Sequence, residues 1–230
     1  MLINTVTPKD FPRKPWANTI AYYQLTTSTT ISDMSGNNRN LTQVDNSTFW
    51  TYNWVNCVYV SWSNASWFHC LYTRDITSNV LGTQFTVQFW GNRDNSKNIR
   101  CGWGWANGSW NGYNLFIDEN WKAVCEALNN WSINSISYSW GYSAWTWYLI
   151  TWTYDNWSCK LYINWTQVAS WTYTAWAINV FWVGTTFGTE ATWYTYQWNG
   201  YVSKVILENK VRTAQEINDY YNWTKADYWL

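Results

Sequence analysis

Three carboxylates, Asp118, Glu119 and Glu126, form the closest group of side chains that could perform acid–base chemistry. Retaining glycoside hydrolysis needs two carboxyl groups about 5–5.5 Å apart, one as the nucleophile and one as the acid. On one strand such groups would stand at positions i and i+2 or i+4, because alternate residues share a face. The chain has no string of this kind, and the three carboxylates flank a predicted hairpin turn at Asn120. We therefore interpret them as solvated turn residues and expect no enzymatic activity.

The histidine and the cysteines provide no further catalytic or metal-binding set. His69 is the only histidine and is adjacent to Cys70. Neighbouring residues of a strand face opposite sides, so these two side chains are not expected to form a nucleophile–base pair. A zinc site needs paired close spacings of Cys or His, and the chain has no CxxC pair. We interpret the five cysteines as small semi-buried residues with room for one disulfide: Cys57, Cys70, Cys101, Cys125 and Cys159.

The charge balance excludes whole classes of partner. Lys plus Arg and Asp plus Glu both number 14, the formal net charge is zero, and 12% of the residues are charged. A protein that binds nucleic acid or an anionic membrane surface needs a basic field, which this composition does not supply. The polar N-terminus lacks the apolar core of a signal peptide, and no apolar run approaches about 18 residues. We expect neither nucleic-acid binding nor membrane insertion.

Alternation of apolar and polar residues with a period of two predicts a β protein. In FTVQFW (85–90), Phe85, Val87 and Phe89 share one face of a strand, and the residues between them share the other. Clusters of Asn, Ser, Thr and Gly separate such runs at a spacing of roughly 8–12 residues, which is typical of a sandwich or barrel. Further strands are predicted at residues 147–154, 160–164, 166–170, 178–184 and 201–207.

One helix is predicted near the C-terminus, over about residues 213–222. Thr213-Ala-Gln-Glu216 is a capping box, in which the Thr hydroxyl accepts from the Glu216 amide while the Glu side chain reaches back. Apolar and aromatic residues then follow at helical spacing: Ile217, Tyr220 and Tyr221.

Tryptophan is too abundant and glycine too scarce for a turn-rich β protein. The chain has 24 Trp and 11 Gly, whereas the usual Gly frequency of about 7% would give roughly 16. The second residue of a type I′ hairpin turn needs a positive φ, which Gly adopts freely and an aromatic residue does not. Forcing Trp there costs of order 1–3 kcal/mol per site. Six Trp nevertheless follow a turn-type Asn: Trp54, Trp121, Trp131, Trp157, Trp165 and Trp223.

With Gly in place of such Trp, residues 151–176 read TWTYDNGSCKLYINGTQVASGTYTAG. This segment resembles the laminin G-like branch of the concanavalin A-like lectin/glucanase superfamily, in which a T-Y-D-G strand leads into an L-Y-V-N-G hairpin. AYYQL with ISDMSGNNRNLT resembles the opening strand and loop of that family, and TQFTVQFW resembles its F-T-I-S-A-W strand. NLFIDENWKAVCE resembles a family hairpin, and WNGYVSKVILENKVRTAQEI resembles the closing strand and helix. The resemblance covers about residues 21–222.

The resemblance implies an all-β fold, a two-sheet antiparallel jelly-roll sandwich of concanavalin A-like type, with one short C-terminal helix. It also suggests a codon explanation, because some bacterial lineages and their phages read UGA as glycine, and translation under a code that reads UGA as tryptophan places Trp instead. The competing interpretation is a true Trp-rich surface that stacks on sugar rings. Trp90 and Trp147 stand where the family itself has Trp, Trp152 fits a strand, and UGG codons are expected at the first two. UGA codons are expected at Trp54, Trp157, Trp165 and Trp223.

Domains of this superfamily often hold Ca²⁺ at the sheet rim, and the segment SDMSGNN offers oxygen ligands. Asp33, Ser35 and Asn37 could supply some of them, with loop carbonyls completing six or more. The competing interpretation is an Asx-type turn, in which Asp33 bonds to backbone amides of its own loop. We favour the turn, and we expect no other cofactor.

The resemblance also implies where a glycan would bind, because lectin-like clefts of this fold use loop Asn and Asp with one or two aromatic faces. The loops richest in these residue types are 101–114 and 184–197. Ordinary exposed loop aromatics, or recoded glycines, are the alternative at each position. The candidate ligand-binding residues are Trp103, Trp105, Asn111, Tyr113, Tyr194 and Tyr196.

We expect an extended lead-in over 1–18, one domain over 19–222 and a short tail over 223–230. By resemblance, the leading function is a non-catalytic binding or display module that acts outside the cell, at a cell surface or on a virion. Its expected ligand is a glycan such as a cell-surface polysaccharide, and its expected protein partners are virion or cell-surface proteins. A single domain with its own Met start is typical of a phage tail, fibre or decoration protein. The alternatives are a purely structural phage tail or surface protein without a small ligand, and a divergent glycoside hydrolase.

Overall fold

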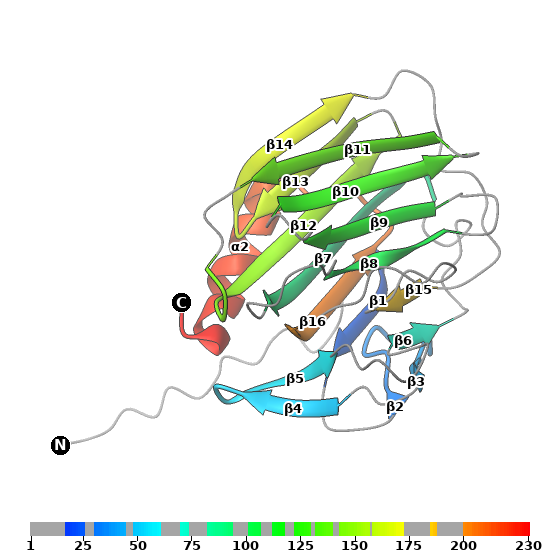
Figure 1. Ribbon diagram of the computed structural model, residues 1–230. Coiled ribbons are helices and arrows are strands. Elements are labelled where there is room, and N and C mark those ends of the chain that lie inside the picture. The colour runs from blue at the N-terminus through cyan, green and yellow to red at the C-terminus, as the bar shows by residue number, and fades with distance from the viewer. Residues whose placement is uncertain are drawn as a thin grey trace.

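Two antiparallel sheets of eight strands each lie face to face, with one α-helix behind them (Figure 1). The computed structural model describes residues 17–25, 30–44, 48–60, 70–73, 82–93, 101–106, 112–117, 122–129, 132–139, 143–156, 158–172, 185–187 and 200–230. Sheet A contains, in spatial order, β14 (Thr166–Thr172), β13 (Ser158–Ile163), β12 (Trp147–Asp155), β7 (Gln84–Arg93), β16 (Gly200–Glu208), β5 (Val55–Val60) and β4 (Thr48–Tyr52), and β1 (Thr19–Gln24) also pairs with β16. Sheet B contains β11 (Ser132–Ser139), β10 (Lys122–Asn129), β9 (Gly112–Ile117), β8 (Cys101–Ala106), β15 (Thr185–Phe187), β6 (Cys70–Thr73), β3 (Leu41–Val44) and β2 (Thr30–Ile31). The predicted all-β sandwich is confirmed.

The predicted alternation along β7 determines which of its side chains enter the space between the sheets. Phe85, Val87 and Phe89 are all buried in the core that the two sheets share. Trp152 and Tyr154 of the neighbouring β12 join them, with ring centroids 5.2 and 5.0 Å from that of Phe85. An aromatic-rich strand pair in the middle of sheet A therefore forms much of the sandwich interior.

Sheet B buries one face and exposes the other. Register places Cys125 of β10 opposite Leu115 of β9 and Ile136 of β11, and all three are buried in the shared core. Ser135 and Ser137, on either side of Ile136, are exposed. This is the one-sided burial typical of an antiparallel sheet whose second face meets water.

The outer face of sheet A is covered by α2 (Ala214–Thr224) and the short 3₁₀-helix η1 (Lys225–Tyr228), both red in Figure 1. The ring of Trp90 stacks on Tyr228 with centroids 4.0 Å apart and lies 5.7 Å from the ring of Tyr221. The Trp90 Nε1–H donates to Thr224 Oγ1 at 3.1 Å. In the described part of the chain, no helix has the length and apolar character needed to cross a membrane.

The predicted capping box of α2 is present. Thr213 Oγ1 accepts from the Glu216 N–H at 3.2 Å, and the Glu216 carboxylate accepts from the Thr213 N–H at 2.8 Å. The helix ends at Thr224, later than predicted, and η1 follows directly. Within residues 223–230, which we expected as a short tail, Thr224 and Tyr228 are buried, and Tyr228 packs on the outer face of sheet A.

The Asn-Trp pairs differ in backbone conformation. β4 and β5 are joined by the two-residue turn Asn53-Trp54, with φ of +48° and +66°, so Trp54 does occupy a glycine position, as predicted. In the two-residue turn between β13 and β14 only Asn164 is left-handed, at φ +59°. The expectation of a positive φ is therefore wrong for Trp165, and it is wrong for Trp223, which lies within α2. The other three pairs place their Trp outside the described residues: Trp121, Trp131 and Trp157.

A buried ion pair holds the connector between β16 and α2. Arg212 donates to both carboxylate oxygens of Glu208, through Nε to Oε2 and through Nη2 to Oε1 at 2.9 Å. The side chains are 3% and 0% exposed. Thr86 of β7 adds two bonds, since its Oγ1 accepts from the Arg212 N–H at 2.9 Å and donates to the Lys210 carbonyl at 2.7 Å. These contacts fix where the chain leaves the sheet and so where α2 starts.

Arg212→Met should lower the free energy of unfolding by about 3–5 kcal/mol, because the Glu208 carboxylate would stay buried without its cationic partner. Urea denaturation monitored by Trp fluorescence measures this loss. Lys210→Met is the matched control on the same connector, since its partly exposed pair with Glu216 is worth at most about 1 kcal/mol. Equal losses in the two variants would contradict a special role for the buried pair.

Candidate ligand-binding surface

Three of the six predicted ligand-binding residues lie in strands of sheet B. Trp103 and Trp105 belong to β8 and Tyr113 to β9, and the register pairs Trp105 with Tyr113 and Trp103 with Leu115. Paired positions of antiparallel strands share a face, so these three positions stand on the face that carries Leu115, which is buried. Outside the described residues lie Asn111, Tyr194 and Tyr196. The six-residue ligand site stays a prediction.

An aromatic cluster that the sequence did not indicate lies at one end of sheet A, and we call Tyr52, Trp145 and Tyr201 the end cluster. The rings of Tyr52 and Tyr201 are stacked, with centroids 4.5 Å apart and planes 18° apart. The ring of Trp145 lies 6.1 and 6.4 Å from them, and this side chain is 48% exposed. These residues come from the end of β4, the loop before β12 and the start of β16. Only the pairing of β4, β5 and β16 brings them together, which is why no local pattern predicted them.

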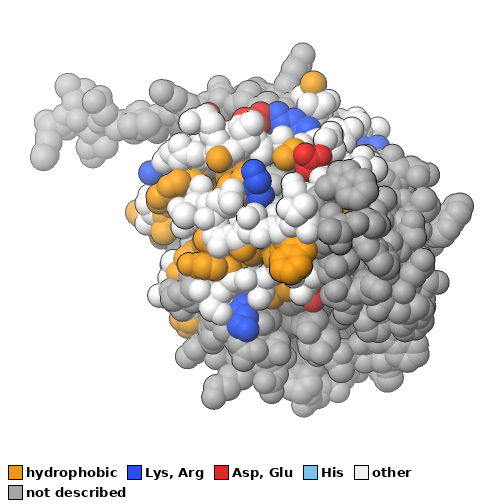
Figure 2. Space-filling model, turned by 90° about the horizontal axis from the view of Figure 1, so that it is seen from above, with side chains coloured by type: hydrophobic (Ala, Val, Ile, Leu, Met, Phe, Trp, Pro, Cys, Tyr) orange, Lys and Arg blue, Asp and Glu red, His pale blue; other side chains and the backbone are white. Residues whose placement is uncertain are grey.

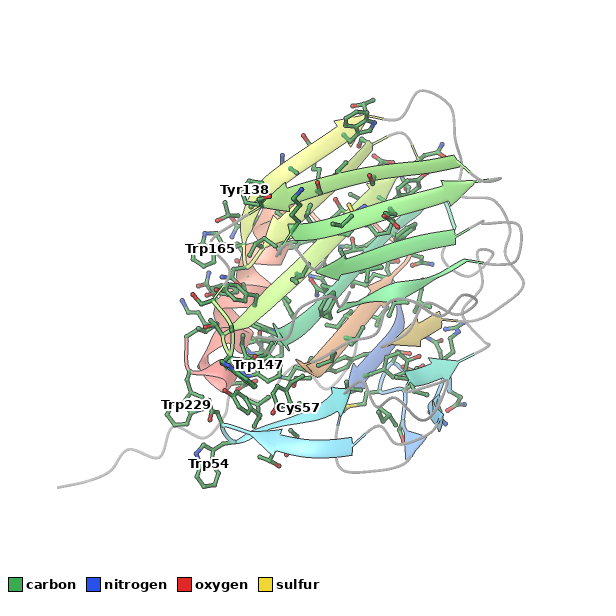
Figure 3. All side chains as sticks on the ribbon, in the orientation of Figure 1. Trp54, Cys57, Tyr138, Trp147, Trp165 and Trp229 are labelled. Carbon is green, nitrogen blue, oxygen red and sulfur yellow. The ribbon has the colours of Figure 1, made fainter. Side chains whose placement is uncertain are left out.

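Two further indoles extend into solvent at the β4–β5 hairpin (Figure 3). Trp54, in the turn, is 87% exposed, and Trp229, past the end of η1, is 74% exposed. The Trp229 Nε1–H donates to the Asn53 carbonyl at 3.1 Å, so the C-terminus is bound to the hairpin. This end of the molecule therefore exposes several aromatic side chains close to one another.

Three further aromatic residues are exposed on β11, in the turn before β14 and on β14: Tyr138, Trp165 and Trp171. Figure 2, which views the molecule from above, shows strips of hydrophobic side chains among backbone atoms and other uncharged side chains, with a few Lys, Arg, Asp and Glu side chains between them on the part that is not grey. Aromatic faces next to uncharged polar groups suit a ligand that is itself uncharged, polar and partly apolar, as sugar rings are.

Most of the acid–base candidates named from the sequence lie outside the described residues. Of the three carboxylates singled out above, Glu126 alone falls on a described segment, half-buried on β10 opposite Ser135. Among the described residues, no group of three or more His, Cys, Asp or Glu could hold a metal ion. Asp118, Glu119 and His69 lie outside the described residues.

Buried thiol and phenol groups on the outer side of sheet A are held in their protonated forms. Burial raises the pKa of Cys57 to about 12, against a smaller lowering by a backbone hydrogen bond from Tyr52. Burial, together with the nearby Asp227 carboxylate, raises the pKa of Tyr22 to about 12. Burial likewise raises the pKa of Tyr228. At neutral pH these groups are therefore poor nucleophiles and poor bases, and their role is packing.

Asp33 organises the loop between β2 and β3. Its Oδ1 accepts from the backbone N–H groups of Tyr22 and Ser35 at 3.0 and 2.9 Å. Its Oδ2 accepts from the Ser35 hydroxyl at 2.7 Å and from the Arg39 N–H at 3.1 Å. Asn40 Oδ1 in turn accepts from the Asp33 N–H at 2.8 Å. Asp33 is buried, so this network ties the loop to β1.

These hydrogen bonds bear on the choice between a calcium site and an Asx-type turn. Each oxygen of the Asp33 carboxylate already accepts two hydrogen bonds, which uses its lone-pair directions. Asn37 directs its amide nitrogen, at 3.0 Å, to the carbonyls of Thr19 and Ile20. The geometry supports the turn that we favoured, and calcium binding by Asp33, Ser35 and Asn37 stays a prediction.

Solved structures with the same fold include binding domains of bacterial toxins. The receptor binding domain of botulinum neurotoxin D matches with a TM-score of 0.71 and 18% identity, over 89% of this chain and 51% of that chain. The binding domain of Paraclostridial Mosquitocidal Protein 1 matches with a TM-score of 0.70 and 16% identity, over 89% and 52%. A botulinum neurotoxin type C structure, reported for cell entry that depends on two ganglioside molecules, matches with a TM-score of 0.70 and 18% identity, over 89% and 51%.

These similarities show the fold alone. The sequence identities of 16–18% are too low to show more than that. The chain spans about half the length of the solved chains that it matches. No family model and no curated protein sequence matches it. The sequence-based resemblance is thereby confirmed at the level of a jelly-roll-like β-sandwich, and two of the matched structures reported above are named as binding domains.

Asp33→Ala should lower the free energy of unfolding by about 3 kcal/mol, since hydrogen bonds to a charged acceptor are worth about 1.5–3 kcal/mol and the Tyr22 N–H would lose its acceptor. Met34→Ala is the control in the same loop, because Met34 is 51% exposed, and we expect little change. Thermal melts in calcium and in EDTA complete the test, with equal midpoints expected for the wild type. A calcium-dependent rise that disappears in Asp33→Ala would establish the metal site instead.

Proposed function

We propose that this protein is a non-catalytic binding module that recognises carbohydrate outside the cell, at a cell surface or on a virion. One observation carries the proposal: 89% of the chain matches about half of several solved toxin chains, of which two are named as binding domains and another is reported for its interaction with two ganglioside molecules. The low charge and the aromatic residues on a neutral polar surface agree with a glycan ligand. Within the sandwich folds, we assign the domain to the laminin G-like, lectin-type branch.

The location of the ligand follows the sequence-based expectation. We propose that the loops around 101–114 and 184–197 carry the contacts, with Tyr194 and Tyr196 providing aromatic faces. The end cluster is a second aromatic surface that a glycan could contact, and it is supported by the stacked rings of Tyr52 and Tyr201. Virion or cell-surface proteins are the proposed macromolecular partners.

A purely structural phage tail or surface protein is the main alternative. It is favoured by the same low charge and by the burial of the Cys57 thiol and of the Tyr22 and Tyr228 phenols, since neither property requires a small ligand. A divergent glycoside hydrolase is the weaker alternative, and it would depend on Asp118 and Glu126.

Binding to a glycan array and to ganglioside-containing vesicles tests the proposal. We expect saturable binding to a subset of glycans that weakens about tenfold, or about 1.4 kcal/mol, in the double variant Tyr194→Ala/Tyr196→Ala, because stacking on a sugar ring would be lost. Met34→Ala is the control, since Met34 is 51% exposed, lies outside both loops and is not one of the exposed aromatic residues described above.

Absence of binding to every glycan, combined with stoichiometric recovery of the protein in purified particles, would favour the structural alternative. Release of reducing ends from a polysaccharide, abolished by Asp118→Asn or Glu126→Gln, would favour the hydrolase. Binding that persists in the loop variant and is lost in Tyr52→Ala would move the site to the end cluster.

A further inference from the structure

Within the described segments, left-handed backbone conformations are restricted to three residue types. Apart from glycine, every described residue with positive φ is Asn or Trp: Asn38, Asn53, Asn156, Asn164, Trp54, Trp145 and Trp229. Asn is enriched in this conformation because its short polar side chain bonds to the local backbone, whereas a bulky residue there is an outlier. None of the described Tyr or Phe residues adopts it. Trp is therefore the one aromatic type found in this conformation among the described residues.

Two of the three Trp stand at positions that glycine fills for well-understood reasons. Trp54, at φ +66°, is the second residue of a two-residue hairpin turn. Trp229, at φ +61°, follows η1, and its N–H bonds to the Ala226 carbonyl at 3.5 Å while the next N–H, of Leu230, bonds to the Lys225 carbonyl at 3.3 Å. This pair of bonds is the Schellman motif, whose left-handed residue is usually Gly.

Trp145 is the third case, and it does not follow Asn. It has φ +65° in the turn before β12. Its ring contacts with Tyr52 and Tyr201 are tilted, at 6.1 and 6.4 Å. Because the three Trp are 87%, 48% and 74% exposed, burial does not repay the strain of their backbone.

A second set of Trp shows the opposite properties. Trp90, Trp147 and Trp152 are 0%, 3% and 0% exposed, lie in strands and have no positive φ. Trp90 also donates a hydrogen bond to Thr224. The indole rings of these three residues are part of the packed core.

We infer that glycine is the natural residue at 54, 145 and 229, and that each codon is a UGA read as glycine. The two properties used here, a positive φ and an exposed indole, do not require a preceding Asn. They therefore add positions 145 and 229 to the codon hypothesis. It also alters the surface on which any binding function depends. Three exposed indoles would be absent from one end of the molecule, and the stacked Tyr52 and Tyr201 would remain there.

The gene sequence tests this directly. We expect UGA at 54, 145 and 229 and UGG at 90, 147 and 152. The mass of the peptides that contain 54, 145 and 229, from protein isolated from its natural source, should correspond to glycine. UGG at the first three positions would overturn the inference, and so would UGA at the three buried positions, because UGA would then encode tryptophan in this gene.

Protein stability provides a second test that does not need the gene. Trp54→Gly and Trp229→Gly, made in the Trp-containing protein, should each raise the folding equilibrium constant about fivefold, which is the scale of relieving one strained residue. Trp171→Gly is the matched control, since Trp171 is 54% exposed and has no positive φ, and we expect no gain. If Trp54→Gly and Trp229→Gly did not raise the stability above that of the starting protein, and so behaved like Trp171→Gly, the inference would be overturned.

An independent observation concerns two cysteines that face each other across the sandwich. Cys125 of β10 enters the core from sheet B and Cys159 of β13 enters it from sheet A, and each is 0% exposed. The structure holds both as thiols. The two strands that carry them contact each other, and the nearby Cys159 adds to the rise in the pKa of Cys125 that burial causes. Cys57 lies in the other core cluster, on the outer side of sheet A.

We propose that Cys125 and Cys159 close an inter-sheet disulfide when the chain folds in the presence of a disulfide oxidant such as oxidised glutathione. One protein thiolate attacks the glutathione disulfide and releases one glutathione thiol. The second protein thiolate attacks the mixed disulfide and releases the other, so the protein loses two hydrogens and glutathione gains them. Burial raises the pKa of Cys125 in the folded protein, so the exchange must precede complete folding, and the finished bond is then shielded from reductant.

Refolding of the reduced chain in a glutathione redox buffer, followed by alkylation in denaturant and peptide mapping, tests this second proposal. We expect a linked peptide pair containing Cys125 and Cys159, two hydrogens lighter than the free thiols, that dithiothreitol opens only after denaturant is added. Cys57 is the internal reference and should be alkylated in full. Full alkylation of Cys125 and Cys159, or a linkage of either to another cysteine, would overturn the proposal.

Discussion

The middle of sheet A is buried on both faces, and most of the remaining structure depends on this constraint. Its inner face packs on sheet B through residues such as Phe85 and Trp152. Its outer face carries Trp90 and Trp147, which would be costly to expose, so α2 and η1 must cover it. The C-terminal segment is for this reason a third layer of the domain, and Tyr228 at the end of the chain is as well buried as many residues of the sandwich interior.

The connector that delivers this third layer is held by polar contacts rather than by packing alone. Glu208 and Arg212 are charged groups with almost no exposure, and such a pair favours one geometry strongly because every alternative leaves a charge unpaired. Thr86, on the predicted polar side of β7, is buried for the same reason: its hydroxyl serves the connector backbone. This buried polar residue marks the place where the connector between β16 and α2 is bonded to β7.

The surface shows how backbone conformation and binding potential are connected. Three of the exposed indoles, at positions 54, 145 and 229, stand on a left-handed backbone that favours glycine, so the proposed glycine at these positions would remove them from any binding surface. The Tyr52–Tyr201 stack does not depend on that question. It results from strand pairing between distant segments, which makes it the aromatic surface least affected by how the Trp codons are read.

The sequence by itself determined the all-β class, the strand faces of β7 and the helix start at Thr213, because period-two alternation and a capping box are local signals. Tertiary structure alone decided the end of the helix, since Tyr228 is ordered by Trp90 on a strand more than a hundred residues earlier. It also decided which Asn-Trp turn is strained: the residues at 53–54 and 164–165 look alike, yet the φ angles differ at Trp54 and Trp165. The end cluster could not be predicted either, because it depends on the register and neighbours of β4, β5 and β16, which are long-range properties that no local pattern encodes.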